Sequence, residues 1–444
     1  MSSSHSDGGF GTHQLPVVQL PYERFELSCG GVLLVTRRAG APVTALRAQM
    51  WGGSELDPKG QEGLAHLTGS LLDQGTTRHT DEELAAILEP EGGDVRGDGL
   101  GVSGAIVGSS WPLLVDIVAE LITETSFPEE RVEMQKKRLL TRLAVEAEDP
   151  RSQGARRFKK LVYGDHFLGR ASHGDVDSLT RISAQDLRAH RATHWCGKRL
   201  LLAVAGDVDP AAVFAHVERA FAALPPGTPH VRAEGAFPAL GQRIDVFERA
   251  RNQVHVYLGH LGVKRTDPDW VPLVVMDHIL GTGPGFTNRI TRKLRDELGL
   301  AYSVQADIHS SAGLHPGTFT AYIGTSPEHL GVAIRGFRDE MRRIQDEPVS
   351  QEELDTAKSY LVGSFALGFE RAARRAGYLI TAERFGFPRD YLATLPRLYA
   401  EVSVADVQRV AQRYLFPDAC AVSAAGPVTA AELASLLAQV EGPA

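Results

Sequence analysis

The sequence has few cysteines, no long apolar run and no excess of basic residues. Its three cysteines, Cys29, Cys196 and Cys420, lie far apart in a chain of 444 residues. This spacing excludes a disulfide framework and a paired-cysteine metal site, and it is typical of proteins in a reducing compartment. No uninterrupted apolar stretch approaches the ~18 residues that a membrane helix needs. The net charge of -8 argues against a nucleic-acid-binding surface.

Targeting signals and several catalytic motifs are also missing. The first residues, MSSSHSDGGFGTHQLP, lack the cationic start and apolar core of a signal peptide. We therefore expect a disordered lead-in over residues 1–20 and a cytoplasmic protein that contacts no membrane. The sequence has no Gly-x-Ser-x-Gly motif and no cysteine–histidine nucleophile arrangement, which argues against the corresponding hydrolases.

The composition indicates a globular protein with more than one domain. Apolar residues make up 43% of the chain and charged residues 23%, which are ordinary values for a globular protein. A chain of this length is too long for one hydrophobic core. The Pro/Gly-rich stretch that starts at Pro225 is the best linker candidate. We expect an N-terminal domain over residues 21–226, a linker over 227–241 and a C-terminal domain over 242–444.

An internal repeat supports two similar domains. The segment Ser183-Ala-Gln-Asp186 recurs in the second half of the chain as Ser403-Val-Ala-Asp406. Both segments have the pattern of a capping box that starts a helix. The same separation along the chain relates the apolar strand pattern that ends at Gly206 to the one that ends at Gly426. The sequence thus predicts two tandem α+β domains, each a mostly antiparallel sheet covered on one face by helices.

The stretch GTGPGFTNRITRKLRDELGLAYS, residues 281–303, places Arg295 seven residues before Tyr302. We expect a glycine-rich turn, a basic helix and a strand with Tyr302 at its start. A guanidinium and a phenol at one sheet edge can both donate hydrogen bonds to a peptide carbonyl. Spacing alone also allows a surface ion pair and an unrelated strand-edge tyrosine. The turn lacks a phosphate-binding signature, so we interpret it as a turn only.

The helix expected at residues 63–73 reads GLAHLTGSLLD. It resembles the zinc helix of the pitrilysin/insulinase family of metallopeptidases, whose motif is His-x-x-Glu-His. In that motif the two histidines bind zinc and the glutamate is the general base. The present chain keeps His66 but has Gly69 at the base position and Ser70 at the second ligand. The motif is therefore degenerate, and none of these three residues is expected to function.

The family's third zinc ligand is a glutamate on a later helix, at a position that falls near Thr141 or Arg142 here. Glu146 is close, but using it requires the register to slip by one helical turn. Because a catalytic zinc requires three protein ligands, we expect no metal in this chain and no activity of the chain alone. His190 and His194 have ligand spacing on a helix, but no free carboxylate or cysteine completes a site there.

The resemblance extends over nearly the whole chain and is most specific in the second half. The run from the glycine turn to Gly-Leu-Ala-Tyr-Ser-Val is similar to the family segment that carries an arginine and a tyrosine seven residues apart. Arg295 and Tyr302 match these positions, which in the family reach substrate bound in the opposite half. Pro284 is a departure within the turn. Gly92-Gly93-Asp94 resembles the approach to the edge strand against which substrate lies.

The resemblance implies a zinc-less subunit of a heterodimeric zinc metallopeptidase. A homologous partner chain is expected to supply the zinc and the general base, while Arg295 and Tyr302 act in trans on bound peptide and on the oxyanion. Two alternatives stay open. The chain could be a catalytically inactive pseudopeptidase that acts as a scaffold or peptide-binding subunit, or a homodimer that binds peptides without cleaving them.

Overall fold

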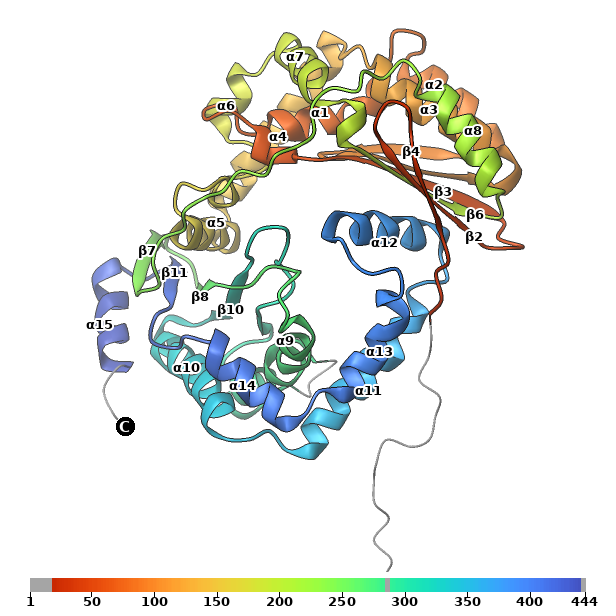
Figure 1. Ribbon diagram of the computed structural model, residues 1–444. Coiled ribbons are helices and arrows are strands. Elements are labelled where there is room, and N and C mark those ends of the chain that lie inside the picture. Colours follow the sequence, from red (N-terminus) through yellow and green to blue (C-terminus); the bar gives the residue numbers. More distant parts are fainter. Residues whose placement is uncertain (1–17, 284–287, 441–444) are drawn as a thin grey trace, which may run out of the picture. The chain divides into compact units, whose positions relative to one another are not determined.

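The computed structural model describes residues 18–283 and 288–440, which form two compact units (Figure 1). Each unit contains one β-sheet and a hydrophobic core of its own. No helix within the described part of the chain is long and apolar enough to cross a membrane.

The division of the chain into units is not purely sequential. The N-terminal unit comprises Leu20–Ala239 together with Phe369–Pro388, and the C-terminal unit comprises Leu240–Gly368 and the described chain from Arg389 onward. The sequence alone predicts that all of residues 242–444 belong to the second domain. The segment Phe369–Pro388 departs from that expectation, because it folds with the first unit.

The N-terminal unit contains six strands and nine α-helices among its described residues. Its strands are β1 (Glu23–Glu26), β2 (Val32–Arg37), β3 (Val43–Met50), β4 (Asp94–Asp98), β5 (Gly101–Val107) and β6 (Leu200–Gly206). Its helices are α1 (Leu64–Ser70), α2 (Asp81–Leu88), α3 (Trp111–Glu124), α4 (Glu129–Glu148), α5 (Pro150–Tyr163), α6 (Val176–Arg181), α7 (Ala184–His194), α8 (Pro210–Ala220) and α12 (Ala372–Phe385).

The C-terminal unit contains five strands and six α-helices among its described residues. Its strands are β7 (Arg243–Glu248), β8 (Val254–Leu261), β9 (Val304–Asp307), β10 (Thr318–Thr325) and β11 (Ala421–Gly426). Its α-helices are α9 (Trp270–Asp277), α10 (Leu330–Asp346), α11 (Gln351–Leu367), α13 (Tyr391–Glu401), α14 (Val404–Tyr414) and α15 (Ala430–Val440), and π-helical segments span His278–Thr282 and Thr291–Glu297.

Apart from β1, which has no counterpart among the described strands of the second sheet, the two sheets share one topology, and this agrees with the predicted repeat of an α+β unit. The strand order is β1-β2-β6-β3-β5-β4 in the N-terminal unit and β7-β11-β8-β10-β9 in the C-terminal unit. β2 and β6 are parallel, as are β7 and β11, while the remaining pairs are antiparallel. Gly206 and Gly426 end the equivalent strands β6 and β11. The capping boxes at Ser183 and Ser403 both form.

Helix α12 covers the sheet face of the N-terminal unit that lies opposite α3 and α8 (Figure 1). Side chains alternate between the two faces of a strand. Along β3, Leu46 and Ala48 join the core beneath α3. Gln49 points the other way and accepts a hydrogen bond from Arg384 of α12 at 3.3 Å. Ala203 on β6 is also fully buried. This second face of the sheet must also be shielded from water, which explains why Phe369–Pro388 folds with the first unit.

The expected linker is attached to the N-terminal unit over part of its length. Arg199 donates a hydrogen bond to the carbonyl oxygen of Thr228 at 3.0 Å. Further along, His230 Nε2 lies 3.1 Å from a carboxylate oxygen of Glu55, and the two side chains are buried. The chain between 228 and 230 is therefore anchored, so any hinge between the units must lie beyond this point.

Candidate functional site

Helix α1, which carries the degenerate motif, is firmly held in the N-terminal unit. It begins after Gly63, whose φ of 94° lies in the left-handed region. The carboxylate of Asp57 accepts hydrogen bonds from the backbone N–H groups of Gly63 at 2.9 Å and Ala65 at 2.7 Å. Burial raises the pKa of Asp57 to about 6. Leu64 and Leu67 pack in a buried cluster with residues of α4 and α7.

His66 lies near another histidine and near a guanidinium. Its ring meets the ring of His173 edge-on, with the centroids 6.4 Å apart. Burial lowers the pKa of His66, and the nearby charges of His173 and Arg142 lower it further, while Asp98 acts in the opposite direction. The imidazole is therefore neutral at pH 7. The guanidinium of Arg142 on α4 opposes the binding of a cation here.

Backbone atoms of β4 fill the space that a side chain at the general-base position would need. A Cβ placed on Gly69 would lie 1.8 Å from the carbonyl oxygen of Asp98, at the end of β4. A Cβ on Gly97 of β4 would likewise lie 2.4 Å from the carbonyl oxygen of Gly69. The helix and the edge strand thus touch through glycine. A glutamate cannot occupy position 69 without displacing β4. The neighbouring Ser70 hydroxyl donates to the carbonyl oxygen of Leu67 at 3.4 Å.

The expected position of the third ligand is also occupied by other interactions. Thr141 donates its hydroxyl to the carbonyl oxygen of Lys137 at 2.9 Å, within α4. Arg142 binds Glu146 at 2.6 Å, and His173 Nε2 lies 3.5 Å from the other oxygen of Glu146. Glu146 is thus compensated by two neighbours. The residues at this site do not fit a catalytic zinc ion, because only one motif ligand and no base are present.

A cavity of about 570 Å³ adjoins His173, between α4, α5 and α6. This volume is within the range of small-molecule sites. Its wall contains Arg156 and Lys159 of α5 as well as Asp175 and Asp177. Because these charges are of both signs, the cavity shows no preference for a ligand of one charge.

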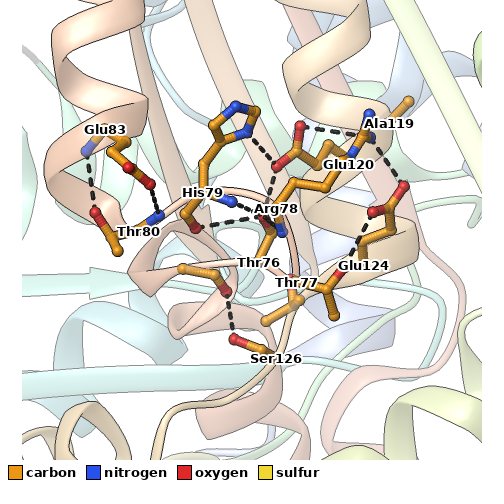
Figure 2. Close-up of polar contacts among 12 residues, drawn as sticks. Thr76, Thr77, Arg78, His79, Thr80, Glu83, Ala119, Glu120, Glu124 and Ser126 are labelled. Atoms are coloured by element: carbon orange, nitrogen blue, oxygen red, sulfur yellow. Dashed lines mark hydrogen bonds and ion pairs between the residues drawn. The ribbon is translucent and has the colours of Figure 1, made fainter.

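A buried polar cluster fixes the turn that follows α1 (Figure 2). Glu120 of α3 is only 3% exposed. It accepts a hydrogen bond from the hydroxyl of Thr76, lies 2.9 Å from His79 Nδ1 and pairs with Arg78 at 3.4 Å. Arg78 also pairs with Glu124 at 2.9 Å. The cluster attaches the α1–α2 connection to α3 and so holds the degenerate motif in place.

This cluster is not among the sites predicted from the sequence. Immediately after it, Thr80 and Glu83 exchange hydrogen bonds in a capping box at the start of α2. The available signal was a lone glutamate, Glu120, in the otherwise apolar run LLVDIVAELI. A carboxylate on a buried helix face requires a charged or hydrogen-bonding partner.

The C-terminal candidates lie on either side of a glycine turn. Arg295 is on the π-helical segment Thr291–Glu297, and its Nε donates to the adjacent Asp296 at 2.8 Å. The segment ends before Gly299, whose φ is 62°. Tyr302 is 96% exposed and precedes β9 by two residues, so the expected strand starts later than predicted. Within the described part of the chain, no hydrogen bond joins Arg295 to Tyr302. Pro284 lies outside the described residues.

A buried ion pair just before the π-helical segment attaches the start of this segment to α11. Arg289, 4% exposed in its side chain, binds both carboxylate oxygens of Glu353 at 2.7 and 2.9 Å. Glu353 also caps α11, because it exchanges hydrogen bonds with Ser350. The hydrogen bonds from Arg289 lower the pKa of Glu353 to about 2, although burial acts in the opposite direction.

Two other clusters contain histidines at spacings that could hold a metal ion. His190 and His194 lie with their ring centroids 4.7 Å apart, but His194 Nδ1 faces the guanidinium of Arg199 at 3.1 Å. Burial lowers the pKa of His190 to about 3. Within the described part of the chain, one group of three potential ligands has its donor atoms within 4.8 Å, namely Asp277, Asp307 and His309. Its central carboxylate oxygen already accepts three hydrogen bonds, as described below.

Comparisons with known proteins find similar chains in one family. The profile of the family described as "Peptidase M16 inactive domain" matches residues 181–361. An uncharacterised zinc protease of Streptomyces coelicolor is 27% identical over 360 residues, which are 77% of this chain and 76% of that protein. The non-peptidase homolog YmxG of Helicobacter pylori is 24% identical over 372 residues, covering 82% of this chain and 85% of that protein.

Solved structures are similar over almost the entire chain. The peptidase M16 inactive domain of Pseudomonas fluorescens superposes with a TM-score of 0.86 and 25% identity, covering 93% of this chain and 99% of that chain. A protease of Helicobacter pylori has a TM-score of 0.82 at 18% identity, covering 92% of this chain and 100% of that chain. The second likeness concerns the fold alone. The chain is thus similar over most of its length to M16, or pitrilysin, peptidases, and its matches include the inactive domain of that family.

Proposed function

We propose that this chain is the non-zinc subunit of a heterodimeric metallopeptidase. A homologous partner chain supplies the zinc site and the general base. The present chain supplies Arg295 and Tyr302, which bind the peptide and donate hydrogen bonds to the oxyanion in trans. The observation that carries the proposal is a contrast between the two units. The base position at Gly69 is closed by backbone, whereas Tyr302 is 96% exposed beside an edge strand.

The position of Tyr302 suits contact with an extended peptide. In the part of the chain that the structure describes, β9 pairs with β10 on one side only, and Tyr302 lies two residues before β9 begins. A peptide that adds to such an edge receives main-chain hydrogen bonds from the strand. A phenol next to that edge can donate to the peptide carbonyl as negative charge develops on it. A preorganised donor of this kind contributes about 3–4 kcal/mol to catalysis.

In the structure the guanidinium of Arg295 pairs with Asp296. The Arg295 side chain is 20% exposed and that of Asp296 is 41% exposed. A peptide carboxylate or carbonyl that binds Arg295 competes with Asp296 for the guanidinium.

The second candidate is a catalytically inactive pseudopeptidase that serves as a scaffold or binds peptides. The separation of Arg295 from Tyr302, which share no hydrogen bond among the described contacts, favours it, because a shared catalytic pair has no preformed contact here. Peptide binding along the edge strands β4 and β9 suffices for this function, whether the chain pairs with a homologue or with itself.

Isolation of the chain with its native partners distinguishes these functions. The proposal expects a homologous chain with an intact His-x-x-Glu-His motif, one zinc per complex and cleavage of peptides by the complex but by neither chain alone. Isolation of a stable assembly that contains no zinc-bearing homologue, and that binds peptides without cleaving them, would establish the pseudopeptidase instead.

A further inference from the structure

Asp277, the last residue of α9, is a fully buried carboxylate with an unusual set of partners. Its Oδ2 accepts hydrogen bonds from the backbone N–H of Ile308 at 2.8 Å, the backbone N–H of His309 at 3.0 Å and the Nδ1 of His309 at 2.6 Å. All three donors lie immediately after the edge strand β9. The other oxygen, Oδ1, is buried and has no hydrogen-bond partner within the described part of the chain.

The same helix end touches β9 through its backbone. A Cβ placed on Gly281 would lie 2.2 Å from the carbonyl oxygen of Ala306, in the middle of β9. The helix changes to a π-helical turn directly after Asp277, over His278–Thr282. Inserted π-turns of this kind occur frequently at functional sites. Among the described strands, β9 pairs with β10 alone, so these contacts with the end of α9 fix the position of β9 on its other side.

The internal repeat shows what is particular to this contact. In the N-terminal unit the edge strand β4 meets α1 in the same way, through Gly69 and Gly97. That contact involves glycine backbone and closes the former base position. In the C-terminal unit the equivalent contact at Gly281 is supplemented by the buried carboxylate of Asp277. Edge strand β9 is thus attached to α9 by a buried carboxylate in addition to the glycine contact.

We propose that Asp277, acting through His309 and two backbone amides, is a positioning residue that fixes β9 and therefore Tyr302 for contact with a peptide. The role of Tyr302 in this statement rests on the proposed function, whereas the attachment of β9 can be tested in the chain alone. The cluster is better suited to this role than to a metal, since Oδ2 already has three donors.

The charges around the pair make the attachment dependent on pH. Burial raises the pKa of Asp277. Burial opposes protonation of His309, but the hydrogen bond and charge of Asp277 outweigh it and raise the pKa of His309. Asp307 acts in the same direction on both groups, and Arg265 opposes the protonation of His309. His278 lies nearby, with its ring centroid 6.0 Å from that of His309, and its pKa is lowered mainly by burial.

The test is hydrogen exchange of the backbone amides of residues 304–309 in the isolated full chain. Asp277→Leu removes the acceptor at similar volume and leaves two buried N–H groups unpaired, so protection there should fall about tenfold or more. Asp277→Asn keeps one acceptor oxygen for the two amides and should restore most of the protection. Asp269→Asn is the matched control, because Asp269 precedes the same helix but binds Arg409 and Arg413 of α14.

Hydrogen exchange measured over a range of pH distinguishes positioning of β9 by the ion pair from positioning by packing alone. In the wild type, protection of β9 should decrease as the pH rises through the raised pKa of His309, by about tenfold for each unit of that shift. Asp277→Asn and His309→Gln should both remove this dependence. If Asp277→Leu does not fold, these two variants still decide the question. Unchanged protection of residues 304–309 in both, with the same pH profile as the wild type, would overturn the inference. Such a result leaves the proposed function intact, since that depends on the behaviour of Tyr302 in the assembled complex.

Discussion

The carbonyl oxygen of Asp98 approaches Gly69 so closely that a Cβ at position 69 would lie 1.8 Å from it. The glycine at the position of the family's catalytic base therefore has a structural role. It permits a direct contact between helix α1 and the edge strand β4, and the contact excludes any larger side chain. A return to a zinc-binding helix would require both new ligands and a displaced strand.

Gly69→Ala should destabilise the N-terminal unit by about 1–3 kcal/mol, because the added methyl group overlaps backbone that cannot move freely. The measurement is urea unfolding at pH 7. Gly377→Ala is the matched control, since Gly377 lies inside α12 and a Cβ there meets nothing within 4 Å. The control should be neutral or stabilising by up to ~1 kcal/mol. Equal effects of the two substitutions would show that the contact at Gly69 is not tight.

Glu120→Ala should cost about 2–4 kcal/mol of unfolding free energy, since it leaves His79 and Thr76 without their buried acceptor. The comparison is Asp116→Ala on the same helix. Asp116 pairs with His216 at 2.7 Å but is 57% exposed in its side chain, so its removal should cost less than ~1 kcal/mol. Thermal unfolding of both variants measures the difference. A cost for Glu120→Ala no greater than that for Asp116→Ala would refute the structural role of the cluster.

Glu353 should make the stability of the C-terminal unit depend on pH under acidic conditions. Its folded pKa of about 2 lies below the ordinary value of 4.5, so the ionised group stabilises the folded state above pH 4.5. This contribution is lost as the pH falls through about 2. Glu353→Gln should cost about 2–3 kcal/mol at pH 7 and remove the dependence. Glu352→Gln, at the exposed neighbouring position, should change neither quantity. Unfolding curves between pH 2 and 7 with identical slopes for both variants would contradict the assignment.

The isolated chain should contain far less than one zinc per molecule, because a single motif histidine lies near a guanidinium and Glu146 is already paired. Elemental analysis after dialysis measures the content. Treatment with a chelator should leave the stability of the chain unchanged. Near-equimolar zinc that is lost on chelation, together with peptidase activity, would be incompatible with the site as described. If zinc is found, His66→Ala and His309→Gln identify the unit that holds it.

The repeat could be predicted from sequence because its capped helices have short-range signals. The capping boxes at Ser183 and Ser403 depend on residues three positions apart, and both form as expected. The packing of α12 on the first sheet could not be predicted in this way. Arg384 binds Gln49, which lies near the other end of the sequence, and nothing local in either segment specifies the partner.

Prediction of the candidate sites from the sequence is limited in the same way, because their long-range contacts leave no local signal. The sequence identifies Gly69 as a missing base, but its close contact with Asp98 depends on how β4 packs against α1. Likewise, Asp277 is one of 55 acidic residues in the sequence. Its significance arises from the backbone amides of residues 308 and 309, which no side-chain pattern reveals. Arg295 and Tyr302 were placed on one edge by spacing, and their joint action stays a prediction.

The expected effect of Arg295→Lys in the reconstituted complex differs from that of a change at Tyr302. A lysine keeps the charge but loses the planar fork that binds a carbonyl or carboxylate with two hydrogen bonds. Peptide binding should weaken, so the loss should fall mainly on KM. Lys293→Arg is a suitable control on the same segment, since Lys293 pairs with Glu297 and is exposed. A purely kcat effect of Arg295→Lys would assign the arginine to the oxyanion instead of the peptide backbone.

The kinetics of Tyr302→Phe and His66→Ala in the complex with the zinc-bearing partner test whether Tyr302 acts in trans. Tyr302→Phe removes one oxyanion donor and keeps the ring, so kcat should fall by about 10- to 1000-fold while the assembly stays intact. His66→Ala should leave kcat and KM nearly unchanged, because the residue ligates nothing. An inert Tyr302→Phe together with an inactive His66→Ala would place the chemistry in the N-terminal unit and contradict the account.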